Sequence, residues 1–224
     1  MKKLALFDID GVVYKGHAFF DLVQNQEKEG IIPVGTWQKI LSDLEKYKTG
    51  DKTYKEAADS MLKNYALAIK GLSYSTIFDN NLNYFKANNA SFFDYFEKLM
   101  AKLKISHDLF FVTTNFQFTT KAVGRVFKID RFLCSIAEVK DGEFTGKVGL
   151  SLGGNKGLVG DLVDKYGKNG SIAVGDSEND ADMLDKVEHP FVMEPNSKLQ
   201  VIAKEKGWQI VNRDNIIDII TSHV

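Results

Sequence analysis

The sequence predicts an α/β protein with a doubly wound parallel sheet and an inserted all-α domain. Short apolar runs of strand character recur along the chain, and each ends in small or acidic residues. Amphipathic helical segments separate most of these runs, which is the alternation typical of a doubly wound sheet. One long stretch near the N-terminus differs, because it has helical patterns and no convincing strand.

Four runs are predicted to be parallel strands, because strands buried on both faces are apolar throughout. They are residues 4–7, 109–112, 171–174 and 190–193. Helices are predicted over the apolar stripe within residues 158–166 and around residues 201–203. Residues 137–148 alternate around Asp141-Gly142, which predicts a β-hairpin. Together these elements predict a Rossmann-like core.

The insertion is predicted to be a helical cap domain over residues 14–90, which leaves residues 1–13 and 91–224 as the α/β core domain. It contains helical patterns, such as residues 54–69, and many aromatic residues. It is long enough to have a small core of its own. Its aromatic side chains could stack on a ring-bearing substrate or pack inside the domain, and the sequence leaves both interpretations open.

Composition excludes several classes of protein. Of 224 residues, 44% are hydrophobic and 26% charged, as in ordinary globular proteins. A net charge of −1 provides no field that would recruit nucleic acid or an anionic membrane. No apolar run approaches the roughly 20 residues that span a bilayer. The single cysteine, Cys134, suits a reducing compartment and is predicted to be a buried structural thiol. We therefore expect a cytoplasmic monomer or loose homodimer with no nucleic-acid or membrane partner.

Polar residues follow the predicted strands, at the edge where ligands bind in open α/β sheets. They are Asp8, Asp10 and Gly11 after residue 7, Thr113, Thr114 and Asn115 after residue 112, Asp176, Ser177, Asn179 and Asp180 after residue 174, and Lys156 at a helix start. Each alone has an ordinary structural explanation as a turn, a cap or a solvated lysine. Their order along the chain, each at an element boundary, favours a common site.

These residue types can perform phosphoryl transfer. The Asp8 carboxylate can attack phosphorus and form an aspartyl-phosphate. Asp10 could protonate the leaving alkoxide and then deprotonate water. Mg²⁺ held by Asp8 and Asp176 would neutralise charge, as would Lys156, and Gly11 would let the backbone approach the phosphate. Clustered carboxylates repel one another, so this set itself requires a cation.

The order of these residues resembles the four-motif signature of the haloacid dehalogenase superfamily. The matching segments are Asp8-Ile-Asp10-Gly11-Val12, Phe110-Phe-Val-Thr113, Lys156, and Gly175-Asp176-Ser177-Glu178-Asn179-Asp180. Residues 138–146, 155–157, 179–184 and 203–208 further resemble the branch that includes phosphoserine phosphatases, subfamily IB. The match covers residues 1–13 and about 105–210. Residues 14–90 match only in position and helical character, as a C1-type cap.

The resemblance implies a Mg²⁺-dependent phosphatase that acts on a small phosphorylated metabolite. It implies that Asp8 is the nucleophile and that Asp10 is the general acid and base, with its backbone carbonyl bound to Mg²⁺. Thr113 (or Thr114, one residue on) and Lys156 would bind phosphate, and Asp176 would bind the metal. Asp180 would support the metal or Lys156, and Asn179 would contact phosphate or substrate. The presence of Asp10 argues against hydrolysis of a carbon–halogen bond.

The sequence departs from phosphoserine phosphatases in the cap. His17 occupies the place expected for a glutamate, and residues 1–124 contain no arginine to hold a substrate carboxylate bidentately. Both departures argue against phosphoserine as the substrate. Three alternatives to a phosphatase stay open: a phosphotransferase or phosphomutase on the same scaffold, a phospho-accepting receiver domain, and a non-catalytic protein that binds a phosphate ligand.

Overall fold

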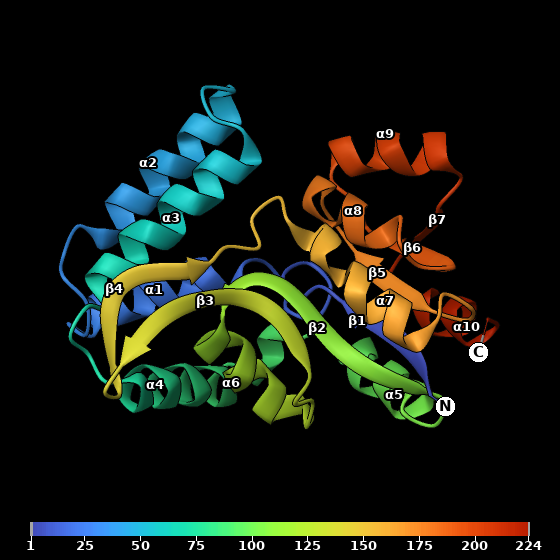
Figure 1. The fold of residues 1–224 in the computed structure, drawn as a ribbon, viewed down its shortest axis with the longest axis horizontal. Helices are drawn as coiled ribbons and strands as arrows, with labels where there is room; N and C mark the ends of the chain where they lie inside the picture. The colour runs from blue at the N-terminus through green and yellow to red at the C-terminus, as the bar shows by residue number, and fades with distance from the viewer. Residues whose placement is uncertain (1, 224) are drawn as a thin grey trace.

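A mostly parallel sheet forms the centre of the computed structural model, which describes residues 2–223 (Figure 1). Its seven strands lie in the order β4-β3-β2-β1-β5-β6-β7. They are β1 (Lys3–Phe7), β2 (His107–Phe116), β3 (Phe132–Lys140), β4 (Glu143–Leu150), β5 (Ile172–Gly175), β6 (His189–Met193) and β7 (Gln209–Val211). All neighbouring pairs are parallel except β3 and β4. The α/β, Rossmann-like fold predicted from the sequence is confirmed.

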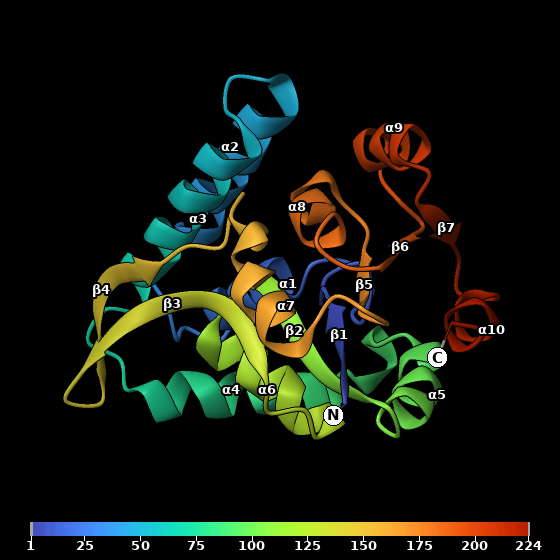
Figure 2. The ribbon, with the colours of Figure 1, turned by 45° about the vertical axis from the view of Figure 1, so that its right-hand side comes forward.

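Helices cover both faces of the sheet because side chains of each strand alternate between the faces. Ala5 and Phe7 of β1 pack into a core with α5 (Asp94–Leu103), α6 (Gln117–Phe127) and α10 (Ile216–Thr221). Leu4 and Leu6 pack into a second core with α7 (Gly160–Tyr166), α8 (Ala181–Leu184) and α9 (Ser197–Lys206). Figure 2 shows α5 and α10 on one side of the strands and α8 and α9 on the other. Continuous apolar runs are therefore explained by burial on both faces.

The predicted strands all form, with one error in length. β2 was expected to end after residue 112 but continues to Phe116, four residues further. Its pairing with β1 ends at Phe111, and its pairing with β3 continues beyond that point with an irregular register. Thr113, Thr114 and Asn115 therefore lie on a strand that extends beyond its neighbour. β7 and the first half of β3 were not predicted.

The predicted hairpin and the two predicted core helices are present. Asp141 and Gly142 both have positive φ (53° and 85°), as two-residue hairpin turns require, and they join β3 to β4. The stripe within residues 158–166 forms a short 3-10 turn, Lys156–Val159, that continues into α7. The helix around residues 201–203 is α9, which ends at Gly207 in the left-handed conformation.

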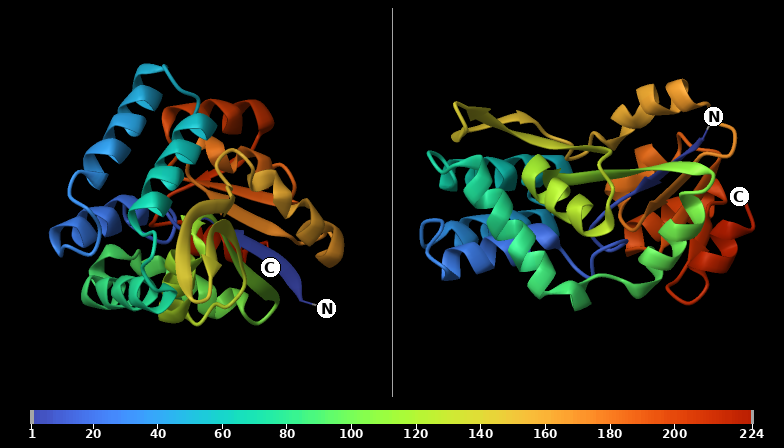
Figure 3. Two further views of the ribbon diagram at one scale, coloured as in Figure 1. Left: turned by 60° about the vertical axis from the view of Figure 1, so that its left-hand side comes forward. Right: turned by 90° about the horizontal axis from the view of Figure 1, so that it is seen from below.

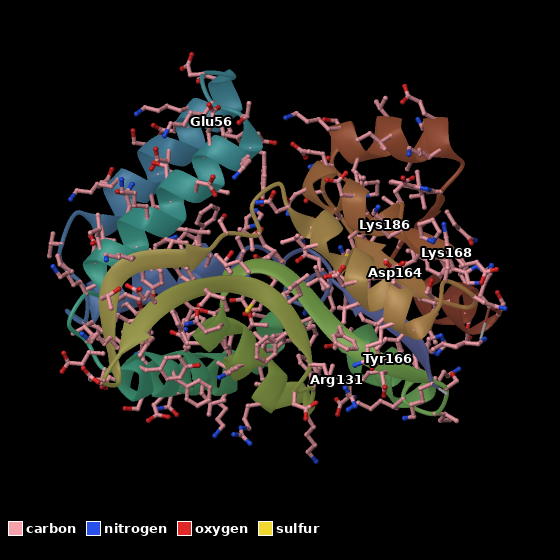
Figure 4. All side chains as sticks on the ribbon, in the orientation of Figure 1. Glu56, Arg131, Asp164, Tyr166, Lys168 and Lys186 are labelled. Carbon is pink, nitrogen blue, oxygen red and sulfur yellow. The ribbon has the colours of Figure 1, made fainter. Side chains whose placement is uncertain are left out.

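The inserted segment is helical, as predicted. It contains α1 (Ala18–Lys28), α2 (Thr36–Thr49), α3 (Tyr54–Ala68), α4 (Tyr74–Ala87) and a 3-10 turn at Asn89–Ser91. α2 and α3 form a pair that rises away from the sheet, whereas α4 lies beside α6 (Figures 1 and 3). A capping box between Thr53 and Glu56 starts α3 at the outer end of this pair (Figure 4).

The insertion has an apolar core, as its length suggested, and this core also includes residues from outside the insertion. Val23, Leu62 and Tyr65 of the insertion belong to one apolar cluster with Phe118 of α6 and Phe144 of β4. Phe85 of α4 packs into the core beneath the sheet. The helices also bury apolar side chains against the hairpin and α6, because those side chains would otherwise be exposed to water. The domain boundaries at residues 14 and 90 stay predictions.

Two further features bear on the class of protein. Among residues 2–223, no helix combines the length and the apolar character needed to cross a membrane. Cys134 is buried, as predicted, and burial raises the pKa of its thiol to about 11. It is therefore protonated at neutral pH, which suits a structural residue rather than a nucleophile.

Candidate active site

Three carboxylates meet where β1 and β5 end. Asp8 directly follows β1, and Asp176 directly follows β5. The two strands are neighbours, and the Asp8 amide donates to the Val174 carbonyl at 3.0 Å. Asp8, Asp176 and Asp180 each offer a carboxylate oxygen within 4.8 Å of the other two. Parallel strands thus bring together residues that lie almost 170 positions apart in the chain.

Asp8 is nearly buried, with 6% of its surface exposed. Its Oδ1 accepts hydrogen bonds from the Ile9 amide at 2.7 Å and lies 2.9 Å from Lys156 Nζ. Burial, together with the charges of Asp180 and Asp10, raises the pKa of Asp8 to about 8 against the opposing effect of Lys156. The carboxylate therefore needs more positive charge than Lys156 supplies in order to be ionised at neutral pH.

Asp10 faces the same space but is not part of the three-carboxylate cluster. Its Oδ1 accepts from the amide of Ala18, the first residue of α1, at 2.7 Å. Its Oδ2 accepts from Asn115 Nδ2 at 2.9 Å. Burial raises the pKa of Asp10, although His17 and these two hydrogen bonds oppose the rise. A carboxyl group held at both oxygens with a raised pKa is well suited to exchange protons with a ligand.

Lys156 is a buried cation between two carboxylates. Its side chain is 1% exposed, and Nζ lies 2.5 Å from Asp180 Oδ1 as well as 2.9 Å from Asp8. Burial alone would lower the pKa of Lys156, but the charges of Asp180 and Asp8 raise it, so the lysine stays protonated. Asp180 Oδ2 also accepts from the amides of Asp176 and Ser177, both at 3.0 Å. Asp180 therefore positions both Lys156 and the loop that carries Asp176.

Two glycines make this close packing possible. A Cβ on Gly11 would lie 2.0 Å from Asp176 Oδ2, and Gly11 has a φ of +72°. A Cβ on Gly175 would lie 2.4 Å from the Asp180 Cβ. The sequence suggested that Gly11 admits a phosphate to the backbone. In the structure, Gly11 is needed because the Asp176 side chain packs directly on it.

The polar residues of β2 and of the Asp176 loop complete the site. Thr113 is buried, and its Oγ1 accepts from Asn115 Nδ2 at 3.0 Å. Thr114 is half-buried, and its Oγ1 is 3.4 Å from Asn179 Nδ2. Asn179 Oδ1 accepts from the Gly154 amide at 2.8 Å. Both threonines border the pocket, so the structure leaves the choice between them open.

The carboxylate cluster fits a hard divalent cation. Its donors are all oxygens, which such cations prefer. Burial, together with the charges of Asp180 and Asp8, raises the pKa of Asp176 to about 9. One lysine thus faces three carboxylates, and a bound cation would relieve their repulsion. Asp8 and Asp176 are the residues best placed to bind it, because Asp180 is engaged by Lys156 and two amides.

A pocket of about 340 Å³ lies over these residues and is closed on its other side by the inserted helices. His17, at the start of α1, borders this pocket and is also exposed to solvent. Tyr54, the first residue of α3, brings its hydroxyl within hydrogen-bonding reach of Thr114 and close to the charges of Lys156 and Asp8. Burial raises the pKa of this hydroxyl, so it is a hydrogen-bond donor at neutral pH.

The outer ends of the inserted helices also touch the core beside the pocket. The Tyr47 hydroxyl of α2 donates to Glu178 Oε1. Lys198 Nζ of α9 lies 3.0 Å from the Tyr47 oxygen, 3.1 Å from Glu178 Oε1 and 4.5 Å from the Tyr47 ring centroid. Asn196 Nδ2 donates to Glu178 Oε2 at 2.7 Å. These contacts hold the inserted helices over the site.

Sequence reasoning missed the functions of three residues in this arrangement. Asn115 was noted only for its position, yet it holds the Asp10 carboxyl. Tyr54 was considered only as one of the aromatic residues of the insertion, and Tyr47 was not considered at all. Tyr54 directly follows Thr53, and the pattern Thr53-x-x-Glu56 is a helix-start signal that could have placed it at the first turn of a helix. No local pattern indicated that this helix start points at Lys156.

Comparisons with known proteins agree with this geometry. The model of the family described as haloacid dehalogenase-like hydrolase matches residues 2–187. A histidinol-phosphatase from Neisseria meningitidis serogroup C (strain 8013) is 38% identical over 53 residues, 24% of this chain and 23% of that protein. The chain thus aligns with less than a quarter of this relative.

Solved structures share the fold. A protein of unknown function from Bordetella pertussis Tohama I superposes with a TM-score of 0.78 at 22% identity, over 95% of this chain and 99% of that one. A phosphoserine phosphatase, solved as an analogue of its phospho-aspartyl intermediate, superposes with a TM-score of 0.66 at 18% identity, over 95% and 93% of the two chains. At these identities the likeness establishes the architecture alone.

Proposed function

The chain belongs to the haloacid dehalogenase-like hydrolases, and on this basis we propose that it is a Mg²⁺-dependent phosphatase that forms an aspartyl-phosphate on Asp8. The observation that carries the proposal is the placement of Asp8. Asp8 directly follows the central strand β1, and its Oδ1 lies 2.9 Å from Lys156 Nζ. Its carboxylate belongs to the same cluster as that of Asp176. Asp10 stands two residues further on with both carboxyl oxygens held. Groups that could act as nucleophile, proton carrier and phosphate-binding cation therefore line one pocket.

In the first half of the reaction, an Asp8 oxygen forms a bond to phosphorus while the bond from phosphorus to the ester oxygen breaks. The departing oxygen takes the proton from Asp10, and the alcohol leaves. Lys156 and the hydroxyl of Thr113 or Thr114 bind the equatorial phosphoryl oxygens, on which negative charge is spread. Positioning and charge neutralisation, rather than strong acid chemistry, supply most of the rate.

In the second half, water attacks phosphorus on the side that the alcohol has left. Asp10, now a carboxylate, takes a proton from this water, and the bond between phosphorus and Asp8 breaks. Inorganic phosphate leaves, Asp8 returns to its free carboxylate and Asp10 returns to its acid form. The hydrogen bonds from Ala18 and Asn115 keep Asp10 in place for both proton transfers.

We assign Mg²⁺ binding to Asp8, Asp176 and the backbone carbonyl of Asp10. When bound, the cation supplies the positive charge that keeps buried carboxylates ionised beside a phosphate dianion. The raised pKa values of Asp8 and Asp176 support this assignment, because without further positive charge both groups would be largely protonated at pH 7.

We further propose that residues 14–90 act as a cap that opens to admit the substrate and closes over it. The contacts of Tyr47 and Lys198 with Glu178 support a closed state. A histidinol phosphate and a phosphoserine are the substrates suggested by the names of similar proteins. The lack of arginine in residues 1–124 disfavours phosphoserine. A cytoplasmic location is retained as a proposal, supported by the single cysteine, and a monomer or loose homodimer is retained as a separate proposal.

The test is metal-dependent release of phosphate from a panel of phosphomonoesters, with Mg²⁺ and with chelator. Asp8→Asn should abolish turnover while leaving the fold intact. Asp164→Asn is the matched control, because it makes the same change on the exposed side of α7 (Figure 4). Acid quenching during turnover should trap phosphate on the peptide that contains Asp8. Phosphate release by Asp8→Asn at the wild-type rate would refute the mechanism. Transfer to an added alcohol in preference to water would identify a phosphotransferase instead.

A further inference from the structure

The side of the pocket opposite Asp8 is an apolar wall. Its members come from the inserted helices, and they are Phe19, Phe20, Leu44, Met61 and Leu62. We call this set the cap wall. Phe19, Phe20, Leu44 and Met61 are only half-buried, although they are apolar, because they face the pocket. A partly uncovered apolar surface inside a binding pocket gains free energy when an apolar ligand group covers it.

The phenylalanine rings of the cap wall are held by aromatic neighbours. Phe19 and Phe20 meet edge to face with ring centroids 5.7 Å apart. Phe19 also packs on Tyr65 at 5.4 Å, and Phe20 on Trp37 at 5.7 Å. This packing fixes the two rings before a ligand binds, so little side-chain entropy is lost on binding.

The charges around the cap wall disfavour an anionic leaving group. Among the described residues that line the pocket there is no arginine, and Lys156 is already bound by two carboxylates. Lys48 is the remaining lysine, and it is exposed to water. Glu178 also lines the pocket, and Tyr47, Asn196 and Lys198 hold its carboxylate oxygens. A second carboxylate on the substrate would face Glu178 without a buried cation.

The pocket is also small. Its volume of about 340 Å³ is near the lower end of the roughly 300–1,000 Å³ range of ligand sites. Part of that volume belongs to the phosphoryl group beside Asp8 and Lys156. The space that is left suits a single ring with a short linker.

We propose that the substrate is a phosphomonoester of a small alcohol that carries an apolar or aromatic ring and no anionic group, with its ring packed on the cap wall. This inference rests on the proposed phosphatase function and identifies the leaving group. It also explains why a cap without arginine can still select a substrate.

The test compares three alkyl phosphates, so that the leaving alcohols differ little in intrinsic reactivity. They are 2-phenylethyl phosphate, with a ring, ethyl phosphate, with neither ring nor charge, and O-phosphoserine, with a carboxylate. We expect kcat/KM for 2-phenylethyl phosphate to exceed each of the others by at least about tenfold, because apolar groups contribute about this much in a matched pocket.

Met61→Arg tests the role of the cap wall directly. It places a carboxylate-binding fork in the wall, so kcat/KM should fall at least about tenfold for 2-phenylethyl phosphate and rise for O-phosphoserine. Leu67→Arg is the control, because Leu67 lies on the same helix with 53% of its surface exposed. It should change neither value more than about twofold. Circular dichroism of both variants verifies folding, and Met61→Gln provides a second, uncharged variant that should lose only the ring preference.

The outcomes separate the two proposals. If O-phosphoserine or ethyl phosphate is hydrolysed as well as 2-phenylethyl phosphate, the substrate class is wrong while the phosphatase function stands. Loss of O-phosphoserine turnover in Lys48→Ala, together with unchanged preferences in Met61→Arg, would place the leaving group at Lys48 and overturn the cap-wall assignment. If none of the three esters, nor any other ester of the panel, releases phosphate, the phosphatase function itself is refuted.

Discussion

Replacing Gly11 by alanine should remove activity through the displacement of Asp176. The new Cβ would lie 2.0 Å from Asp176 Oδ2 and 2.5 Å from its Cγ, distances that side chains do not adopt. Relief requires a separation of at least 3.0 Å, so the carboxylate or its loop must move by about 1 Å. A misplacement of about 1 Å near a reaction centre can lower the rate about 100-fold.

Gly16→Ala is the matched control for backbone strain. Gly16 lies in the same loop with a φ of +99°, and nothing stands within 4 Å of the Cβ it would gain. Both variants place alanine at positive φ, at a free-energy cost of about 1–2 kcal/mol each. Only Gly11→Ala adds a collision with a proposed metal ligand. The difference in activity between the two variants therefore reports the displacement of Asp176, because the backbone strain is common to both.

Urea unfolding and phosphate release at varied Mg²⁺ concentration provide the assay. Gly16→Ala should lose about 1–2 kcal/mol of unfolding free energy and keep kcat within a few-fold. Gly11→Ala should lose at least as much stability, require more Mg²⁺ for half-maximal activity and fall about 100-fold in kcat. If Gly11→Ala retains the wild-type rate and Mg²⁺ dependence, Asp176 is not held against Gly11 or is not needed for the reaction.

Three other changes probe separate parts of the molecule. Lys156→Met should lower the metal-free unfolding free energy by about 3–5 kcal/mol at pH 8, because buried carboxylates lose their cation; equal stability in urea would contradict this. Asn115→Ala should lower kcat about tenfold with little change in KM, because Asp10 loses a 2.9 Å hydrogen bond; steady-state kinetics decides. Burial lowers the pKa of His107 below 6.5. The unfolded chain therefore binds more protons, and wild-type stability should fall as pH drops through about 6.5, less so in His107→Gln.

The α/β core was predictable because its signals are local. A strand buried on both faces must be apolar throughout, so residues 4–7 and 171–174 were recognisable as β1 and β5 without knowledge of their partners. Asp141-Gly142 specified its own turn by tolerating positive φ. The end of β2 was missed because Thr113–Phe116 extends beyond β1, and only pairing with β3 makes it a strand.

The packing partners of the inserted helices could not be predicted from local signals. Its helices could be recognised from their patterns, since an amphipathic helix shows that one face is buried. The pattern does not say what covers that face. Phe118 and Phe144, distant in sequence, share the core of the insertion, and the helical pattern did not predict these two partners.

By itself, the sequence determined the residue types of the candidate site and the edge of the sheet where they gather. Asp8, Lys156 and Asp176 stand at element boundaries, and parallel strands oblige such boundaries to meet. Tertiary structure alone decided which side chains close the pocket. The placement of Tyr54 near Thr114 and Lys156 and the packing of Asp176 on Gly11 depend on contacts between segments far apart in the chain. No local pattern encodes such contacts, because they arise only when the whole chain packs.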